Sequence, residues 1–311
     1  MIGNDVQKAA DILRQGGLVA IPTETVYGLA ANGFNSEAVL RIFEAKNRPS
    51  FDPLILHLCS TKYIERVAAI IPEKAKQLAD TFWPGPLTLI LPKTHLVPDV
   101  VTSGLPFVGL RQPNHPLLKE LFEHVDFPLA APSANPFGMV SPTTAQHVED
   151  QLGDRIDYIL DGGPCTIGVE STIVSLEDPD RPKILRYGAI TQEQIEEVIG
   201  SVGTQISSSS KPSSPGQLDR HYATSKPLEL IESAPQHKSE QTFIIGFGAD
   251  VGNVFDLNLS PTSDLHEAAR KLFSFLREAD KSTALKLMAM RVPDEGIGRA
   301  INDRLKRAAH G

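Results

Sequence analysis

The 311-residue chain is poor in cysteine and in long apolar runs, and each shortage excludes a class of protein. Its two cysteines, Cys59 and Cys165, lack the close spacing of a disulfide framework or a structural zinc site. No stretch reaches the roughly 18 uninterrupted apolar residues typical of a membrane-spanning helix. Charged residues interrupt the first turns, where a signal peptide would carry an apolar core. We therefore expect a cytoplasmic protein without a membrane partner.

Basic residues are in the minority, because 30 Lys and Arg stand against 38 Asp and Glu and give a formal net charge of −8. This balance excludes a basic nucleic-acid coat protein. The composition, with 41% hydrophobic and 22% charged residues, is that of an ordinary globular protein. At roughly 150 residues per domain, the length predicts two domains.

Common catalytic and nucleotide-binding motifs are also missing. The sequence contains neither GxSxG nor HExxH, and no GxGxxG or GxxxxGK[ST] precedes a helix. A nucleotide site in this chain is therefore of neither the Rossmann-fingerprint type nor the Walker type.

Apolar spacing predicts alternating helices and strands over the first 200 residues. Helices are expected over 5–15, 36–46 and 72–82. Short buried strands are expected over 18–21, 54–58, 87–91, 108–111, 129–131 and 171–175. Ser36 is the expected N-cap of the second helix. This alternation predicts one α/β domain over residues 1–200 with a mostly buried sheet.

The composition changes after residue 200. Residues 201–240 contain 10 Ser, 4 Pro and 2 Gly, which predicts a linker rather than a packed element. Tyr222 is the only aromatic residue in this segment; it could stack on a base, cover a pocket or be present by chance. A small β-α-β-α domain is expected over 241–311. Its elements are expected at 242–247, 263–280, 284–290 and 298–309.

Polar residues follow two of the expected elements. Thr23, Thr25 and Tyr27 of PTETVYGL come directly after a strand, where α/β proteins place ligands, and a turn with threonine caps and a core tyrosine is the equal alternative. Lys46 and Arg48 of KNRP follow a helix and form a pair suited to phosphates. Spacing alone favours the alternative of two solvated cations at a helix C-terminus.

Three further motifs carry polar side chains. His57 lies in an apolar strand, which is more typical of a core histidine than of a catalytic one. Ser133 and Asn135 of APSAN offer donors to an anion or form a plain Asx turn. Ser171 and Arg186 pair a hydroxyl with a cation, beside glycines that permit close approach of the backbone to a ligand.

Taken in order, these segments resemble the YrdC-like family of threonylcarbamoyl-AMP synthases, in its longer two-domain form. The similar motifs are PTETVYGL, KNRP, PLILH, the strand ending at Arg111, APSAN, SPT, GVESTIV, ILRYG, SPG, RHYA, FIIGFGA and GIGRAINDRL. The resemblance implies an α/β fold: a twisted open mixed sheet with helices and a concave, positively charged cavity. It also implies a small Rossmann-like C-terminal domain.

The resemblance further implies an enzyme that joins L-threonine, bicarbonate or CO2, and ATP into threonylcarbamoyl-AMP and pyrophosphate. A partner transferase complex would then carry the threonylcarbamoyl group to adenosine beside the anticodon of tRNA, with at most weak contact between this chain and tRNA. A carbamate formed from threonine would be the nucleophile, so no nucleophile from the protein is required. Mg²⁺ would bridge the phosphates with few protein ligands.

By the same resemblance, two sets of residues hold the substrates. Those expected at ATP are Lys46, Arg48, Asp52, Ser133, Asn135, Ser141, Arg186 and Tyr222. Those expected at L-threonine are Thr25, His57, Arg111, Ala131 and Ser171. Lys46 and Arg48 are the expected catalytic residues, Arg111 would bind the threonine carboxylate, and no residue is expected to bind a metal directly.

Two details of this assignment concern the linker and Asp52. The linker over 201–240 would act as an active-site lid that carries Tyr222. Asp52 stands where the family usually has Asn, and an acid there would repel a triphosphate unless it faces Mg²⁺ or water. The cations Lys46, Arg48 and Arg186 are expected to gather with Arg111 in one cavity, while the remaining surface carries the acidic excess.

Two other functions compete with this one. A non-catalytic module for double-stranded RNA or tRNA would use a concave basic face, but the net charge and the lack of aromatic platforms among basic runs argue against it. A YrdC-like carbamoyl-transfer enzyme of hydrogenase maturation would carry a zinc-finger part that two cysteines cannot supply. The last residues are expected to form a solvated helix face. These are Arg299, Asp303, Arg304, Lys306 and Arg307.

Overall fold

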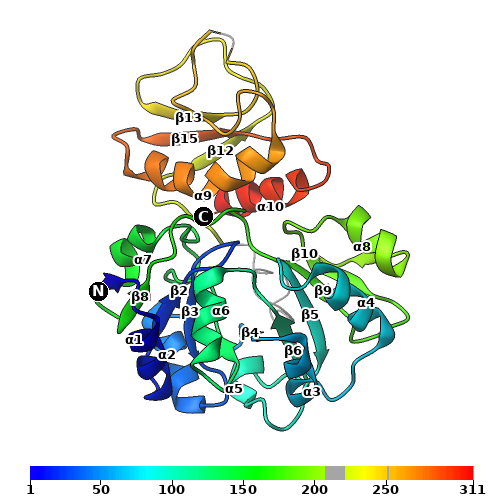
Figure 1. The fold of residues 1–311 in the computed structure, drawn as a ribbon. Coiled ribbons are helices and arrows are strands. Elements are labelled where there is room, and N and C mark those ends of the chain that lie inside the picture. The colour runs from blue at the N-terminus through cyan, green and yellow to red at the C-terminus, as the bar shows by residue number, and fades with distance from the viewer. Residues whose placement is uncertain (207–220, 251, 311) are drawn as a thin grey trace.

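The computed structural model describes residues 1–206, 221–250 and 252–310, which form a large and a small α/β domain (Figure 1). The helices of the large domain are α1 (Val6–Arg14), α2 (Ser36–Lys46), the 3-10 turn η1 (Thr61–Tyr63), α3 (Ile64–Val67), α4 (Glu73–Phe82), α5 (Asp99–Thr102), α6 (Pro116–Glu123), α7 (Ala145–Leu152) and α8 (Gln192–Ile199). Its strands are β1 (Ile2–Gly3), β2 (Val19–Ile21), β3 (Gly28–Asn32), β4 (Ile55–His57), β5 (Leu87–Pro92), β6 (Phe107–Arg111), β7 (Leu129–Ala130), β8 (Tyr158–Leu160), β9 (Thr172–Ser175), β10 (Lys183–Arg186) and β11 (Gly203–Thr204). The small domain consists of β12 (Leu228–Ile231), β13 (Thr242–Gly246), β14 (Leu257–Asn258), α9 (Leu265–Lys281), β15 (Lys286–Met290) and α10 (Gly298–Ala308).

The strands of the large domain form one mixed sheet. Within the described residues it has 11 strands in the order β1-β8-β2-β3-β7-β4-β6-β5-β9-β10-β11. Strands β4 and β6 run parallel, whereas β5 and β6 run antiparallel. Because neighbouring strands are distant in sequence, their ends bring together loops from the whole length of the domain. The expected α/β fold with a mixed sheet is confirmed.

Amphipathic helices cover this sheet, as their apolar spacing predicts. In α1 the buried positions include Val6, Ala9 and Leu13, which lie on one face at three- and four-residue intervals. They share a buried cluster with Leu118 of α6 and with residues of β2, β7 and β8. This packing fixes the positions of β2, β7 and β8 in the sheet. No helix in the part of the chain that the structure describes is long and apolar enough to cross a bilayer.

Periodicity predicts the longer elements correctly and misses most of the short ones. The expected helices correspond to α1, α2, α4, α9 and α10. The expected strands correspond to β2, β4, β5, β6, β7, β9, β13 and β15. The missed elements include β3, α6, α7, β8, β10 and α8. The missed helices α6, α7 and α8 have eight residues each, which gives too few positions for their spacing to stand out from the flanking loops.

Helix α2 is capped by a different residue from the expected one. The sequence predicts Ser36 as the N-cap, but the side-chain oxygen of Asn35 accepts hydrogen bonds from the backbone N–H groups of Glu37 and Ala38. Ser36 is the first helical residue. Asn35 has the extended backbone that an N-cap requires, with φ −100° and ψ 104°.

The predicted linker is shorter than 201–240, because structured strands occupy both of its ends. Strand β11 pairs with β10 in the large sheet, and β12 pairs with β15 in the small one. The small domain therefore begins with β12 rather than at residue 241. Residues 207–220 of the predicted linker lie outside the described residues.

The small domain packs its helices against the large domain. Its four described strands are parallel, in the order β12-β15-β13-β14, and α9 and α10 lie between this sheet and the large domain (Figure 1). A single buried cluster joins Leu272 and Phe273 of α9 to Val140 and Val169 of the large domain. The two domains thus share an apolar core. This core holds α10 against the large domain.

Candidate active site

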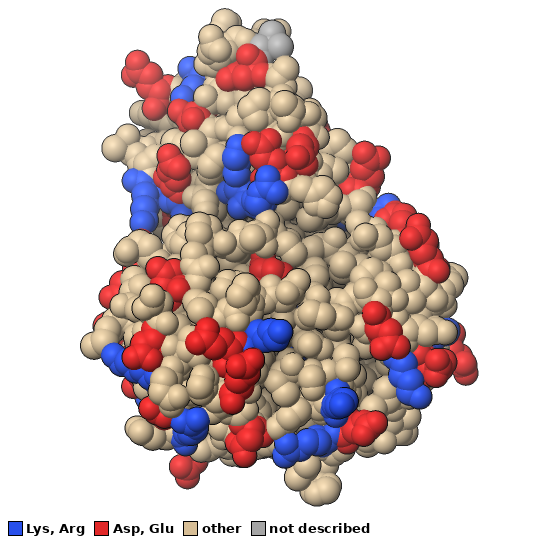
Figure 2. All heavy atoms as spheres, in the orientation of Figure 1, with Lys and Arg blue, Asp and Glu red and all other residues tan. Residues whose placement is uncertain are grey.

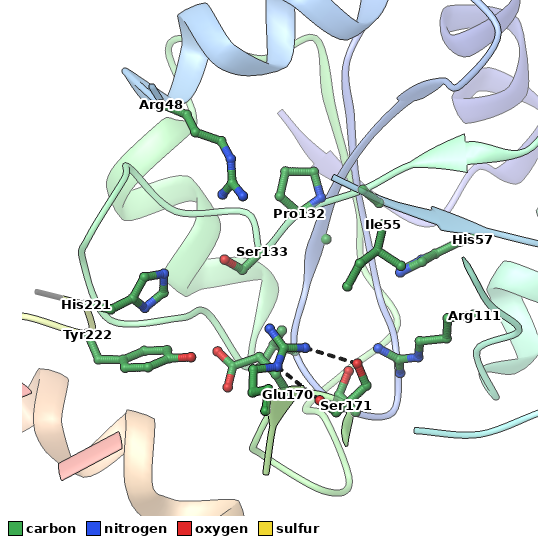
Figure 3. A pocket seen from close by; sticks show the side chains of 15 residues that line it. Arg48, Ile55, His57, Arg111, Pro132, Ser133, Glu170, Ser171, His221 and Tyr222 are labelled. Atoms are coloured by element: carbon green, nitrogen blue, oxygen red, sulfur yellow. Dashed lines mark hydrogen bonds between the residues drawn. The ribbon is translucent and has the colours of Figure 1, made fainter. Parts of the chain in front are cut away.

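A small cavity lies where loops and strand ends of the large domain meet the segment that leads into the small domain (Figure 3). Its volume is about 50 Å³. The lining residues are Thr25, Val26, Gly28, Arg48, Ile55, His57, Arg111, Ala131, Pro132, Ser133, Glu170, Ser171, Arg186, His221 and Tyr222. Arginine and hydroxyl side chains thus surround one buried space.

Two neighbouring parallel strands bring His57 and Arg111 together. These residues end β4 and β6 and are register partners. Arg111 Nη2 lies 2.7 Å from Glu24 Oε1, and Arg111 Nε donates to the carbonyl oxygen of Gly85 at 3.3 Å. Burial and then the charge of Arg111 hold the pKa of His57 well below its ordinary value, so the imidazole is neutral. This corner offers a fixed guanidinium to an anion.

Strands β9 and β10 place a hydroxyl beside a second guanidinium. Ser171 directly precedes β9, and Arg186 ends β10. Arg186 donates to Ser171 twice at 3.0 Å, from Nε to the carbonyl oxygen and from Nη2 to Oγ (Figure 3). Ser171 Oγ also lies 2.8 Å from Oγ1 of Thr88 on β5. Burial lowers the pKa of Arg186 to about 10, so its guanidinium keeps its charge at neutral pH.

Arg48 enters the cavity from the end of α2. The helix ends at Lys46, and the C-cap Asn47, whose left-handed backbone has φ 51°, turns the chain. Arg48 Nη2 lies 2.9 Å from Asp52 Oδ2, and its Nε donates to the backbone carbonyl of Asp52. Asp52 is not among the lining residues, and its side chain holds the guanidinium from behind. The expected repulsion between Asp52 and a phosphate is therefore offset by this ion pair.

Lys46 supports the cavity wall and does not line it. Its Nζ donates to the backbone carbonyl oxygens of Ser133 and Asn135, and its side chain is buried. The side-chain nitrogen of Asn135 in turn donates to the carbonyls of Pro136 and Met139, which is not the Asx turn that the sequence offered as the alternative, because there the side-chain oxygen accepts a backbone N–H. Burial and then the charge of Arg48 hold the pKa of Lys46 well below its ordinary value. Lys46 and Asn135 thus shape the turn that presents Ser133.

The wall also contains a carboxylate, Glu170, that three groups surround. Ser141 Oγ donates to Glu170 Oε1 at 2.7 Å, and Arg304 Nε donates to Glu170 Oε2 at 3.0 Å. Burial alone would raise the pKa of Glu170, but the charges of Arg304 and Arg186, with the Ser141 hydroxyl, lower it to about 2. Glu170 is therefore ionised at neutral pH.

Tyr222 closes the cavity on the side of the small domain. Its ring stacks on Phe273 of α9 at 5.3 Å between centroids, and His221 lies against it at 4.1 Å. The next residue, Ala223, donates its backbone N–H to the carbonyl of Gly138 at 2.8 Å. Figure 3 shows the phenol oxygen of Tyr222 pointing toward Glu170. The segment that carries Tyr222 is thus tied to both domains.

Comparison with known proteins assigns both halves of the chain. Residues 11–188 match the family described as Telomere recombination, and residues 190–310 match the family described as Threonylcarbamoyl-AMP synthase, C-terminal domain. The threonylcarbamoyl-AMP synthase of Pyrococcus abyssi is 41% identical over 98% of this chain and 94% of its own. That of Bacillus subtilis is 44% identical over 99% of this chain and 94% of its own. The chain belongs to the threonylcarbamoyl-AMP synthase family.

A solved structure supports the same family across both domains. The crystal structure of Pyrococcus abyssi Sua5 in complex with L-threonine has a TM-score of 0.91 to this chain, with 38% sequence identity. The match covers 100% of this chain and 98% of the other. The family resemblance and the two-domain α/β fold expected from the sequence are therefore confirmed.

Most residues expected at the family's substrate site line one cavity. Those that do are Thr25, Arg48, His57, Arg111, Ala131, Ser133, Ser171, Arg186 and Tyr222. Four others lie behind the wall: Lys46, Asp52, Asn135 and Ser141. Each of these four bonds to a lining residue or to the turn that carries one. The structure thus separates the expected residues that line the cavity from those that lie behind its wall, which motif spacing could not do.

Sequence reasoning missed Glu170, His221 and Arg304. The expectation of a solvated C-terminal helix face is wrong for two of its residues, because Arg304 is fully buried and Arg307 is only 8% exposed. One signal in the sequence could have indicated the ion pair between Glu170 and Arg304. Glu170 is the acid in GVESTIV, and a carboxylate next to a buried strand requires a cationic partner. The sequence does not show which cation that is.

The family reaction uses ATP, and its phosphates are commonly bound with Mg²⁺. Within the described ranges, no group of three or more His, Cys, Asp or Glu side chains could hold a metal ion. Asp52 and Glu170 are already paired with Arg48 and Arg304. The cavity therefore fits a divalent cation only if phosphates and water supply most of the ligands of that cation.

Proposed function

We propose that the protein is an L-threonylcarbamoyladenylate synthase, which converts L-threonine, bicarbonate or CO2, and ATP into threonylcarbamoyl-AMP and pyrophosphate. The strongest support is the convergence of Arg48, Arg111 and Arg186 on one buried cavity together with hydroxyl groups. Cations in a water-poor cavity suit two anionic groups, a polyphosphate and an amino-acid carboxylate. The names of the Pyrococcus and Bacillus relatives agree with this proposal.

The proposed reaction needs no nucleophile from the protein. The amine of threonine loses a proton and adds to CO2, which gives a carbamate. A carbamate oxygen attacks the α-phosphorus of ATP and forms a new P–O bond. The bond between the α-phosphorus and the bridging oxygen to the β-phosphate breaks, and its electron pair leaves with pyrophosphate. The protein positions the reactants and neutralises their charge.

The corner of β4 and β6 is the proposed threonine site. Arg111 would bind the carboxylate, because Glu24 and the Gly85 carbonyl hold its guanidinium in place. Ser171 would lie near the amine or the hydroxyl. Thr25, Ala131 and the neutral ring of His57 would form the remaining walls. A neutral imidazole adds no second charge beside Arg111 and leaves that arginine to select the carboxylate.

The opposite part of the cavity is the proposed ATP site. Arg48, Arg186 and Ser133 would contact the phosphates, and Tyr222 would cover the nucleotide. We propose Arg48 as a catalytic residue, and Lys46, which the resemblance also places at the chemistry, would act through the turn that it supports. Asp52 would hold Arg48 in place.

The supporting side chains complete this site. Asn135 would shape the turn that carries Ser133, and Ser141 would orient Glu170. Mg²⁺, if held mainly by the phosphates of ATP and by water, would supply positive charge that stabilises the leaving pyrophosphate.

Substrate entry requires the cavity to open. Its volume of about 50 Å³ is far below the roughly 300–1,000 Å³ of sites for small molecules. We propose that His221 and Tyr222 move aside when ATP enters and return over it, which would exclude water from the reaction. Tyr222 has a left-handed backbone, with φ 61°, which is uncommon for a tyrosine.

Pyrophosphate release tests the proposed function. The purified chain with Mg²⁺ and ATP should release pyrophosphate only when both L-threonine and bicarbonate are present. Arg186→Ala should abolish the release, whereas Arg41→Ala, which removes a half-exposed arginine of α2 outside the cavity, should leave it unchanged. Release that does not depend on threonine would contradict the assignment.

The product requires a recipient. Threonylcarbamoyl-AMP is a mixed anhydride that water destroys, so we propose that a transferase complex accepts it directly and modifies adenosine beside the anticodon of tRNA. This chain would then meet tRNA only weakly, and the cytoplasm, which contains ATP and tRNA, would be its location.

A further inference from the structure

The small domain reaches the cavity through one side chain. Arg304 of α10 is fully buried, and its Nε donates to Glu170 Oε2 at 3.0 Å across 134 residues of sequence. Arg304 Nη1 lies 2.9 Å from Asp303 Oδ2, and Asp303 also accepts from Arg307 at 3.0 Å. The guanidinium is therefore anchored by its own helix and directed across the interface at a carboxylate that lines the cavity.

We propose that Arg304 is a positioning residue of the nucleotide site, because its ion pair with Glu170 holds and neutralises the carboxylate beside the phosphate-binding arginines. This inference rests on the proposed function, in which Arg48 and Arg186 bind the phosphates. Among the described residues that line the cavity, Glu170 carries the one carboxylate. Without Arg304 that charge would repel the triphosphate and compete with it for Arg186 in a medium of low dielectric constant.

The same guanidinium also holds the cover of the cavity. Its central carbon lies 5.5 Å from the ring centre of Tyr222, which is a cation–π distance. Phe273 of α9 also stacks on the ring of Tyr222, at 5.3 Å between centroids. Arg304 thus fixes one wall through Glu170 and supports the cover through Tyr222, and both effects favour bound nucleotide.

Holding the domains together does not explain this arrangement. Arg299, on the same helix, reaches Glu193 of the large domain at 2.7 Å, and Lys281 of α9 reaches Asp150 at 2.8 Å. Neither of these ion pairs touches the cavity. Arg299 is therefore a matched control: it is an arginine of α10 that forms an ion pair between the domains but contacts no lining residue.

Nucleotide binding tests the inference independently of turnover. The full chain, Arg304→Gln and Arg299→Gln would be titrated with the Mg²⁺ complex of a non-hydrolysable ATP analogue by calorimetry. We expect the Kd to rise at least about tenfold in Arg304→Gln and to change less than about twofold in Arg299→Gln. In a separate pyrophosphate-release assay, the KM for threonine should change less than about threefold, because zwitterionic threonine has no net charge for Glu170 to repel.

A second substitution separates charge from structure. If Arg304 acts by neutralising Glu170, the double variant Arg304→Gln/Glu170→Gln should recover the Kd to within about threefold of the unmodified chain. A double variant that binds as weakly as Arg304→Gln would overturn the inference. If Arg304→Gln does not fold, Glu170→Gln alone decides: equal or tighter binding supports the inference, and a tenfold loss overturns it. An unmodified chain that binds the analogue but releases no pyrophosphate contradicts the proposed function only.

Discussion

Single residues determine the charge of the cavity through their partners. Arg48 is paired with Asp52, and Arg111 is paired with Glu24. A buried charge without a partner costs several kcal/mol, so removing either carboxylate would destabilise the fold and release the guanidinium that it holds in position. Because the pairing groups approach from behind the wall, the cavity keeps a cationic lining although the whole chain is acidic.

Lys46 allows a test of support against direct catalysis. Lys46→Met removes the donor to the buried carbonyls of Ser133 and Asn135, and each unsatisfied carbonyl costs about 1–3 kcal/mol. We expect a fall of several degrees in the melting temperature together with weaker ATP use. Lys119→Met, on the exposed face of α6, should change neither. An unchanged melting temperature with abolished ATP use would instead show that Lys46 acts on the nucleotide directly.

Glu170 links stability to acid pH. Its pKa of about 2 in the folded chain lies below the value of about 4.3 expected when unfolded, so its ionised form stabilises the fold above that value. This stabilisation, of about 3 kcal/mol, is lost as the pH falls from about 4.3 toward 2. Between about pH 6 and pH 3, the melting temperature should fall less in Glu170→Gln than in the unmodified chain. Exposed Glu240 supplies the control, and equal acid sensitivity of Glu170→Gln and Glu240→Gln would contradict the prediction.

At the scale of elements, the two helices of the small domain support the cavity from outside its lining. Helix α9 supports Tyr222 through Phe273, and α10 supplies Arg304. Their existence follows from their apolar periodicity, which the sequence shows. Which of their faces meets the large domain does not follow from it, because the buried arginines of α10 look like a solvated face when the helix is considered alone.

Close packing of α9 depends on a glycine. Gly168 has φ +87°, and a Cβ there would lie 2.5 Å from the carbonyl oxygen of Ala269 and from Cα of Arg270. Gly163 has a similar φ of +80° but no atom within 4 Å of an added Cβ. Both Gly→Ala variants should therefore carry a backbone strain of about 1–2 kcal/mol. Gly168→Ala should lower the melting temperature clearly further by pushing α9 away, and equal shifts in calorimetry would contradict this reading.

At the scale of the whole molecule, the net charge of −8 opposes strong nucleic-acid binding, and so does the distribution of charge on the face drawn in Figure 2. Lys and Arg lie among Asp and Glu on the face drawn in Figure 2, and no broad basic patch is visible there. The cations expected to gather in one place are buried at or behind the cavity. This arrangement suits a small polyanion and agrees with the family, whereas an RNA-binding module would expose its basic residues.

A measurement of tRNA binding distinguishes a site for a small polyanion from an RNA-binding module. At physiological salt concentration we expect a Kd weaker than about 10 µM, in the range of non-specific association. Substituting Arg186 with Ala should leave this value unchanged, because its side chain is buried. Submicromolar binding with a steep dependence on salt would support an RNA-binding function.

The sequence by itself determined the α/β class, the longer helices and strands, the family and most of the lining residues, because these depend on local periodicity and on motifs. The tertiary structure decided which polar residues face the cavity and which stand behind it. It also decided where the small domain begins and that Arg304 meets Glu170. Contacts across 134 residues, such as this one, arise from the packing of α10 on the large domain. No local pattern encodes them, because a buried ion pair needs a partner but not a fixed distance along the chain.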